Sequence, residues 1–405
     1  METNRIYCGD CGKVMSQFPE KSVDLIYADP PFFSNRRYEV IWGDGYEIRS
    51  FEDRWKGGIE NYIAWMDPKL RECHRVLKDS GSMYLHCDWH ANAHLRILMD
   101  KIFGENNFGD EIIWTFNKVA GTKKKLLKWH ETIYRYAKNY DKVVFNIDAI
   151  REPYSASTLK RAKKGPDGKL YYGGRGLGLR QDIKRSRESP INPLGRVPGD
   201  VWNLGNYAPP KAEQLGYPTQ KPETLLDRII SASSNPTDIV LDPFCGCGTA
   251  VAVAETSKRR WIGIDVSPTA CKIMAQRMRK KGVSIEDKDI IGLPRSLSEV
   301  KAMQPFEFQN WVIQTLGGRL SERPVHDYGI DGWLLDRPVQ VKQSDGVGRN
   351  VVDNFETALR RVKKREGVIV AFDFGRGAYE EVARAKLEDQ LVIALMTVED
   401  VLNAA

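Results

Sequence analysis

The sequence lacks any apolar run near the roughly 20 residues that a membrane-spanning helix needs. Residues 1–5 form no apolar segment with a cleavage site, so we expect no secretory signal and a cytoplasmic protein. Seven cysteines, an odd number scattered over 405 residues, favour reduced thiols over a disulfide framework. With 41% hydrophobic and 28% charged residues, the chain has the composition of a globular protein of two or three domains.

Two common nucleotide-binding fingerprints are also missing. There is no complete Gly-x-Gly-x-x-Gly motif, and no Gly-Lys-Ser/Thr follows the glycine-bearing loop at 246–248. These absences count against a dinucleotide-binding fold and against a phosphate-binding loop. Cys8 with Cys11, and Cys245 with Cys247, have no partner pair nearby, so we expect no zinc at these positions.

Positive charge is concentrated in one part of the chain. The whole sequence has a net charge of +7, but residues 116–215 contain 21 Lys and Arg against 9 Asp and Glu, a net +12, so the remainder is net acidic. This segment predicts a polyanionic partner, with a solvated basic loop surface as the alternative. Its basic clusters lie at 123–125, 160–164 and 184–187, interleaved with Trp129, Tyr134, Tyr136, Tyr154, Tyr171 and Tyr172.

Alternating strand and helix patterns predict an α/β domain with a mainly parallel sheet, formed by residues 1–115 and 216–285. The segment between them, 116–215, is a long basic insertion in which only 131–137 and 142–146 have strand patterns. Residues 300–405 predict a separate small α+β domain. The expected strands are 23–28, 82–86, 111–116, 238–241, 261–264, a pair within 333–343, and 367–373; the expected helices are 59–77, 90–103, 222–233, 249–256, 268–280, 305–316, 354–365 and 378–389.

Two expected strands end in nearly the same way, one in Asp29-Pro30-Pro31-Phe32 and the other in Asp242-Pro243-Phe244 followed by a glycine-bearing loop. In an open parallel sheet, ligands bind outside the carboxyl ends of the strands, so both acids should face one pocket. The loop lets the backbone approach a nucleoside-type ligand closely. Asp265 ends the next strand, where an acid is suited to binding ribose hydroxyls.

These motifs resemble those of the amino-directed DNA methyltransferases that use S-adenosylmethionine. Residues 29–32 look like that family's catalytic motif, 242–249 like its methionine-moiety loop, and 219–222 like the signature just before that loop. Their order, with the catalytic motif first, the basic segment second and the cofactor loop last, resembles the permuted beta group. The resemblance covers residues 5 to about 282 and implies a Rossmann-like methyltransferase whose target-recognition region is the basic insertion.

The resemblance implies methyl transfer to an exocyclic amine of a base flipped out of duplex DNA. The catalytic residues would be Asp29, Pro30, Pro31 and Phe32: the Asp29 carboxylate and the Pro30 carbonyl accept hydrogen bonds from the amine, and Phe32 stacks on the base. Methylation of cytosine carbon 5 needs a Pro-Cys nucleophile, and the chain has no Pro-Cys dipeptide. Asp29 favours adenine, because cytosine-N4 enzymes of this group more often carry Ser there; cytosine-N4 is the alternative.

The cofactor-binding residues follow from the same resemblance. Asp265 would bind the ribose of S-adenosylmethionine, and Asp10 would lie near its adenine ring or near the target amine. The amino acid end of the cofactor would contact Asp242, Phe244, Gly246, Gly248 and Thr249, with Gln220, Lys221 and Pro222 closing over it. The expected partner is double-stranded DNA, with no membrane, and the chain would be a monomer or a homodimer.

The C-terminal unit has a second set of candidate residues. Asp331 at a turn, followed by Gln340 and Lys342 two apart on one strand, resembles the Mrr-like branch of the PD-(D/E)XK nuclease fold, with Glu307 as a further ligand and Mg²⁺ as the metal. Gln340 replaces a carboxylate, which weakens the case for the metal. Three readings stay open: a nuclease in a restriction-modification fusion, which could even be the main activity; a module that only holds DNA; and a structural lobe.

Overall fold

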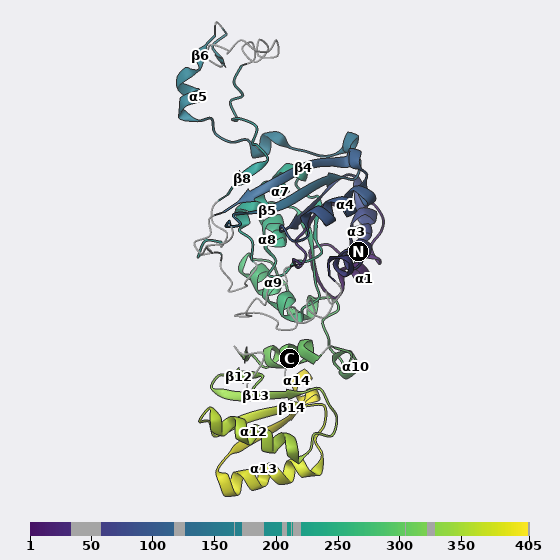
Figure 1. Ribbon diagram of the computed structural model, residues 1–405, viewed down its shortest axis with the longest axis vertical. Coiled ribbons are helices and arrows are strands. Elements are labelled where there is room, and N and C mark those ends of the chain that lie inside the picture. The colour runs from purple at the N-terminus through teal and green to yellow at the C-terminus, as the bar shows by residue number, and fades with distance from the viewer. Residues whose placement is uncertain are drawn as a thin grey trace.

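The computed structural model describes residues 1–33, 58–116, 126–165, 167–171, 190–204, 209–211, 213, 220–303, 305–321 and 329–403. In Figure 1 these residues form a central body around one sheet, an arm that extends from it, and a smaller C-terminal unit around a second sheet. Within the described ranges, no helix has the length and apolar character required to cross a membrane.

Eight strands form the main sheet, in the order β1-β10-β9-β2-β3-β5-β4-β8. Neighbouring strands are parallel except at β5, which runs antiparallel to both β3 and β4. The predicted mainly parallel α/β architecture is therefore confirmed. The strands are β1 (Arg5–Cys8), β2 (Val23–Ala28), β3 (Leu77–Cys87), β4 (Phe108–Thr115), β5 (His130–Ala137), β8 (Val201–Asn203), β9 (Ile239–Asp242) and β10 (Arg260–Asp265).

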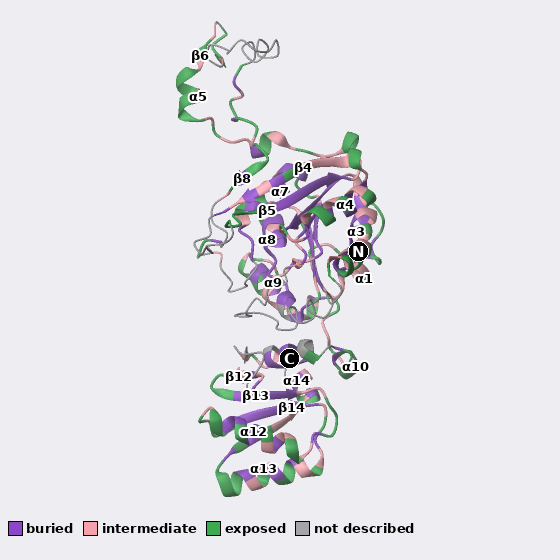
Figure 2. Cartoon of the chain, in the orientation of Figure 1, coloured by how far each residue is buried: buried purple, intermediate pink, exposed green. Residues whose placement is uncertain are grey.

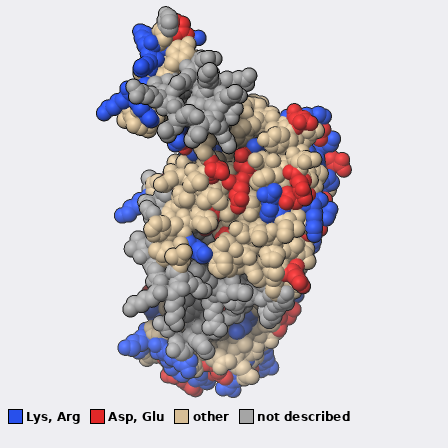
Figure 3. Space-filling view, turned by 45° about the horizontal axis from the view of Figure 1, so that its top comes forward, with Lys and Arg blue, Asp and Glu red and all other residues tan. Residues whose placement is uncertain are grey.

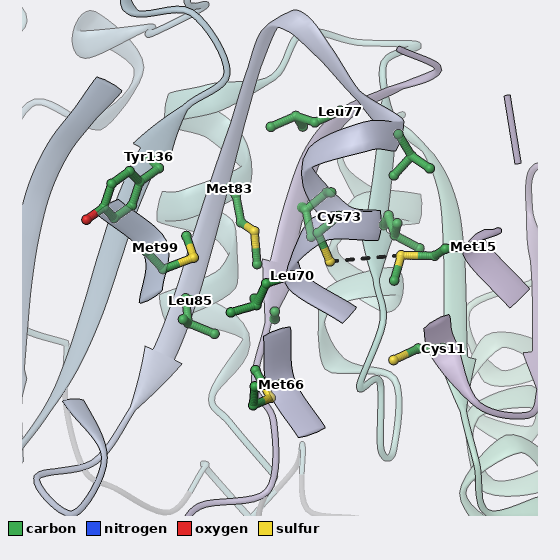
Figure 4. Packing of buried hydrophobic residues seen from close by; sticks show 14 of the residues in the cluster. Cys11, Met15, Met66, Leu70, Cys73, Leu77, Met83, Leu85, Met99 and Tyr136 are labelled. Atoms are coloured by element: carbon green, nitrogen blue, oxygen red, sulfur yellow. Dashed lines mark hydrogen bonds between the residues drawn. The ribbon is translucent and has the colours of Figure 1, made fainter. Parts of the chain in front are cut away.

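Helices cover both faces of the main sheet, because successive side chains of each strand point to opposite faces and both are apolar. Met83 and Leu85 of β3 belong to a core with α1, α3 and α4, where the Cys73 thiol lies 3.9 Å from the Met15 sulfur (Figure 4). Tyr84 belongs to the core on the other face, with α7, α8 and α9. These helices are α1 (Cys11–Met15), α3 (Ile59–Val76), α4 (Asn92–Phe103), α7 (Glu223–Ser233), α8 (Thr249–Thr256) and α9 (Pro268–Lys280); short 3-10 helices are η1 (Glu105–Asn107) and η4 (Asp287–Asp289).

The expected strand over residues 142–146 is wrong. The chain there passes between two short 3-10 helices, η2 (Tyr140–Lys142) and η3 (Ile147–Ile150). Single hydrogen bonds tie it down: the Val144 amide donates to the Ser80 carbonyl at 2.9 Å and the Asn146 amide to the Ala232 carbonyl at 2.6 Å. The β-branched Val143 and Val144 favour an extended backbone, but the segment has no continuous strand partner among the described residues.

Part of the predicted basic insertion belongs to the main sheet, since both β5 and β8 lie within residues 116–215. Tyr134 and Tyr136 are consequently buried core residues of β5 and do not face a partner as the sequence suggested. The clusters at 123–125 and 184–187 lie outside the described residues. The arm between η3 and β8 holds α5 (Ala156–Arg161), β6 (Lys163–Lys164) and β7 (Leu170–Tyr171), and Lys and Arg side chains gather on it in Figure 3.

The C-terminal sheet has the order β11-β12-β13-β14-β15, with parallel pairing only among β13, β14 and β15. In Figure 2, β13 and β14 are largely buried, whereas α13 has an exposed outer face. The elements are α10 (Leu297–Lys301), α11 (Pro305–Thr315), β11 (Arg319–Leu320), β12 (Gly332–Leu334), β13 (Arg337–Lys342), α12 (Arg349–Arg361), β14 (Glu366–Ala371), α13 (Arg376–Asp389), β15 (Val392–Thr397) and α14 (Val398–Asn403).

Candidate active site

Four acidic residues stand at the carboxyl ends of neighbouring parallel strands of the main sheet. Asp242 and Asp265 end β9 and β10, Asp29 follows β2, and Asp10 follows β1. The strand register brings them to one edge, because Asp242 lies opposite Gly263, two residues before Asp265. Burial is the main cause that raises the pKa of Asp242, and the charges of Asp29 and Asp265 add to it.

Asp29 forms an ion pair with Lys221, a residue 192 positions away in the chain. The Lys221 ammonium lies 2.6 Å from the Asp29 Oδ2 atom, and Lys221 is only 5% exposed. The same ammonium is 5.2 Å from the centre of the Phe32 ring. The sequence predicts Lys221 at the cofactor's amino acid end, and in the structure its ammonium contacts the acid of the 29–32 motif.

A buried histidine that sequence reasoning missed lies behind this motif. The fully buried His86 places Nδ1 2.8 Å from the Tyr27 hydroxyl and 4.0 Å from Asp29 Oδ1, while Nε2 is 2.9 Å from Glu131 Oε2. Its ring centre is 5.9 Å from that of Phe32. His86 and Glu131 come from β3 and β5, and polar residues at the ends of two expected strands were the available signal.

The loop between β9 and α8 is held in place by side chains of α9. Gly248 has a left-handed backbone with φ +79°, and a Cβ there would lie 2.5 Å from the Met274 Cγ atom of α9. The buried Arg277 guanidinium donates to the Thr249 hydroxyl at 2.9 Å and to the Cys247 carbonyl at 3.4 Å. Glycine at 248 therefore permits both the turn and the close contact with α9.

Asp242 is 3% exposed, and its Oδ1 atom accepts a hydrogen bond from the Phe244 amide at 3.1 Å. Burial raises the pKa of this carboxyl well above its ordinary value, and the neighbouring charges add to the effect. A cation that bound here would favour the ionised form. The site therefore suits a positively charged ligand group.

Asp265 joins two loops of the site through its carboxylate. Its Oδ2 atom accepts from the Gly246 amide at 2.8 Å, and its Oδ1 atom accepts from the Ser267 amide at 2.9 Å. Asp265 is thus held in a fixed orientation at the edge of the site.

Asp10 has a clear structural task as the N-cap of α1, where it accepts from the Lys13 amide at 3.1 Å. Its Oδ2 atom is 3.0 Å from the ammonium of Lys69. Burial raises the pKa of Asp10, but the hydrogen bond and charge of Lys69 outweigh it, so the net pKa is lowered. Lys69 also lies 4.6 Å from the Trp65 ring, which is 6.0 Å from the Phe244 ring, so Asp10 is connected to the 242–249 loop through α3.

The residues just before α7 are only partly described. Gln220 is buried and donates from Nε2 to the Glu213 carbonyl at 2.7 Å. Pro222 is the N-cap residue of α7. Thr219 lies outside the described residues. The segment just before α7 thus places the Lys221 ammonium against Asp29, whereas the Gln220 side chain is hydrogen-bonded to Glu213 of the same segment.

The candidate residues of the C-terminal unit do not all share a face. Gln340 and Lys342 point to the side of β13 opposite to Val339 and Val341, which pack with Phe308 of α11. Asp331 Oδ2 accepts from the Val341 amide at 2.6 Å, and the Gln340 Oε1 atom is buried with no hydrogen-bond partner among the described residues. The side chain of Glu307 lies outside the described part, and its helix packs on the face away from Gln340.

Comparison with known proteins identifies the family. A family model described as DNA methylase, for N6 and N4 enzymes, matches residues 23–276. The DNA adenine methyltransferase YhdJ of Escherichia coli is 33% identical over 278 residues, covering 68% of this chain and 83% of that protein. The type II methyltransferase M.BglII of Bacillus subtilis is 32% identical over 270 residues, 65% of each chain. A solved structure, the cytosine-N4-specific PvuII DNA methyltransferase, is 17% identical, covers 70% of this chain and 88% of its own, and has a TM-score of 0.47. The chain belongs to the family of N6 and N4 DNA methylases.

Proposed function

We propose that this chain transfers a methyl group from S-adenosylmethionine to the exocyclic amine of adenine in double-stranded DNA. The observation that carries the proposal is the position of Asp29, which stands at the end of β2 with its carboxylate held by Lys221 and the buried Asp242 nearby. Family membership and the likeness to a DNA adenine methyltransferase support it. Cytosine-N4 methylation is the competing outcome.

The target amine would be bound by Asp29 and Pro30. An amine conjugated with its ring is a poor nucleophile, and accepting its two hydrogens draws the lone pair out of the ring and aims it at the methyl group. Lys221 holds Asp29 Oδ2, so Oδ1 is the oxygen available to the amine. The Pro30 carbonyl lies beyond the end of β2 and pairs with no strand in the described part of the chain. Phe32 would stack on the flipped base and offset an unstacking cost of about a few kcal/mol.

S-adenosylmethionine would supply the methyl group on a sulfonium, from which a neutral thioether is a good leaving group for in-line transfer. The residues present fit it: Asp242 is a buried acceptor suited to an ammonium, and Asp265 is a fixed acceptor suited to ribose hydroxyls. Phe244, Gly246, Gly248 and Thr249 would line the amino acid end. Asp10, Gln220 and Pro222 would contribute by fixing the start of α1, the segment before α7 and the start of α7, respectively.

The decisive test is the identity of the methylated base. The full chain is incubated with plasmid DNA and S-adenosylmethionine, and the DNA is digested to nucleosides and analysed by mass spectrometry. N6-methyladenine is expected; N4-methylcytosine would overturn the choice of adenine, and an unmodified plasmid would overturn the proposal. Asp29→Ala should abolish methylation while cofactor binding persists. The matched control Asp79→Ala, at a half-exposed acid near the amino end of β3 and away from the carboxyl ends of the strands, should methylate normally.

We also propose that residues 300–405 form an Mrr-like, nuclease-type unit that holds DNA beside the methyltransferase. Gln340 stands where this nuclease fold would offer a carboxylate, and the Asp331 carboxylate already accepts from the Val341 amide. This donor set fits Mg²⁺ poorly, since hard cations prefer several oxygen ligands with negative charge. We therefore favour DNA binding over cleavage. The likeness to type II methyltransferases suggests a restriction-modification context for the whole protein.

Cleavage and binding can be separated in one set of experiments. Unmethylated DNA is incubated with the protein and Mg²⁺ or Mn²⁺, and DNA affinity is measured before and after truncation following Leu293. Uncut DNA and weaker binding by the truncated chain are the expected results. Cleavage that disappears in Asp331→Ala and Lys342→Ala would establish a nuclease instead. Unchanged affinity without cleavage would leave the unit a structural lobe.

A further inference from the structure

An exposed aromatic group lies just beyond the end of β3. Trp89 is 46% exposed, and its ring stacks on that of His90 with centroids 3.7 Å apart and an interplanar angle of 29°. The Asp88 carboxylate holds the His90 ring at Nδ1, with a separation of 2.5 Å. The Trp89 ring is therefore supported on one side by a ring that is itself fixed.

A cation accompanies this ring from a different part of the chain. The Lys128 ammonium lies 5.3 Å from the centre of the Trp89 ring, within the range of a cation–π contact. Lys128 precedes β5, whose Thr132 pairs with Cys87 at the end of β3. We call Trp89, His90 and Lys128 the Trp89 platform.

The platform stands at the same edge of the sheet as the candidate active site. Ala28 of β2 pairs with Leu85 of β3, so Asp29 is level with His86, whose ring centre is 5.9 Å from that of Phe32. Trp89 follows His86 by three residues, a reach of about 10 Å at most for an extended chain. A DNA duplex that presents a base to Phe32 therefore passes close to Trp89.

The side chains of the Trp89 platform indicate which class of ligand would bind to it. A half-exposed indole beside an ammonium suits a flat aromatic ring attached to a phosphate, which is what a nucleotide presents. The target base itself would occupy the place beside Asp29 and Phe32. Flipping that base leaves one other base without a pairing partner, namely the one opposite to it.

We propose that the Trp89 platform stacks the base left unpaired opposite the flipped target, with Lys128 bound to its phosphate. This inference rests on the proposed function and names a second DNA contact of the same site. Stacking on an aromatic side chain is worth about 1–3 kcal/mol per base, so the platform would repay part of the cost of opening the duplex.

The first test is a crosslink. Once the methylated sequence is known, 5-iodouracil replaces the thymine opposite the target in a duplex bound by the full chain with S-adenosylhomocysteine. Irradiation should attach the DNA to the peptide that contains Trp89, as identified by mass spectrometry, and Trp89→Ala should remove that adduct. Adducts confined to other peptides would overturn the proposal.

The second test removes the opposite base instead. On intact duplex, Trp89→Ala should weaken DNA binding by about 5- to 150-fold, the equivalent of the stacking energy above, whereas Trp89→Phe should retain most of the affinity. On a duplex with an abasic site opposite the target, wild type and Trp89→Ala should bind equally. Tyr140→Ala is the matched control, because Tyr140 is a similarly exposed ring, 47%, beyond the opposite end of β5.

An effect of Trp89→Ala that persists on abasic DNA would overturn the inference, as would a loss that Trp89→Phe fails to restore. The proposed function fails in a different way, through a wild-type protein that methylates no amine. The two failures are distinguishable because the proposed function fails already in the search for a methylated sequence, whereas the Trp89 platform is tested afterwards, by crosslinking and affinity on that sequence.

Discussion

Lys221 has two candidate roles, orienting Asp29 and binding the cofactor, and one substitution can separate them. Its ammonium binds Asp29 at 2.6 Å, although the sequence placed it at the cofactor. If it orients Asp29, Lys221→Met should lower kcat by about 10- to 100-fold, the usual worth of a charge-assisted hydrogen bond, with little change in the Kd for S-adenosylmethionine. Single-turnover methylation and calorimetric cofactor binding measure the two quantities. A weaker Kd with unchanged kcat would instead support the cofactor role.

Asp242 predicts a pH dependence of stability. Burial raises its pKa in the folded chain above the value of about 4 in the unfolded chain, so the folded state binds the proton more tightly. The stabilisation is complete below about pH 4 and is lost as the pH rises through the folded-state pKa. Asp242→Asn stays neutral, so the wild-type free energy of unfolding should fall relative to that of the variant over this range. Urea titrations of both proteins at several pH values measure the difference, and parallel profiles would contradict the expectation.

At the scale of elements, the turn into α8 shows how one residue type sets a loop. Gly248→Ala would combine a left-handed backbone with a Cβ 2.5 Å from Met274 Cγ, whereas Gly282, with φ +87°, has nothing within 4 Å of the same position. Backbone strain alone costs about 1–3 kcal/mol, so Gly282→Ala should lose about that amount. Gly248→Ala should lose more, and should also weaken cofactor binding. Equal losses in urea unfolding would mean that the contact with α9 relaxes at no cost.

Which elements the sequence predicts correctly depends on how local their signals are. The helices 249–256 and 268–280 agree with α8 and α9, since apolar periodicity and the Ser267 cap with Pro268 mark them locally. The strand β15 and helix α14 were missed, because the apolar run 391–396 is followed directly by Thr397 and Val398, with no glycine or proline to mark the boundary. Helix α12 begins at Arg349, five residues before the predicted start.

At the scale of the whole molecule, the acids of the candidate site were predictable, whereas their partners were not. Asp29, Asp242 and Asp265 end strands whose patterns are visible in the sequence. The contacts Asp29–Lys221 and His86–Glu131 depend on which strands and loops become neighbours, with separations of 192 and 45 residues. Strand order of this kind is set by long-range packing, which local patterns do not encode.

The charge of the arm predicts how the DNA affinity of the whole molecule depends on salt. Residues 116–215 carry a net +12, and Lys160, Lys163 and Lys164 are exposed on the described part of the arm. Each phosphate neutralised contributes a slope of about −0.9 to the dependence of log affinity on log salt. If these lysines each contact a phosphate, replacing all three with Ala should flatten that slope by about 3, as measured by anisotropy titrations at several salt concentrations.

A matched control separates local contacts from net charge. Replacing the exposed Lys13, Lys101 and Lys258 of the body with Ala removes the same three charges away from the arm. Long-range attraction changes equally in both triple variants, but counterions are released only where a lysine sits on a phosphate. The arm variant should therefore have the flatter slope while the body variant keeps the wild-type slope. Equal slopes in the two variants would mean that DNA does not bind along the arm. The arm would then not be the source of sequence recognition either.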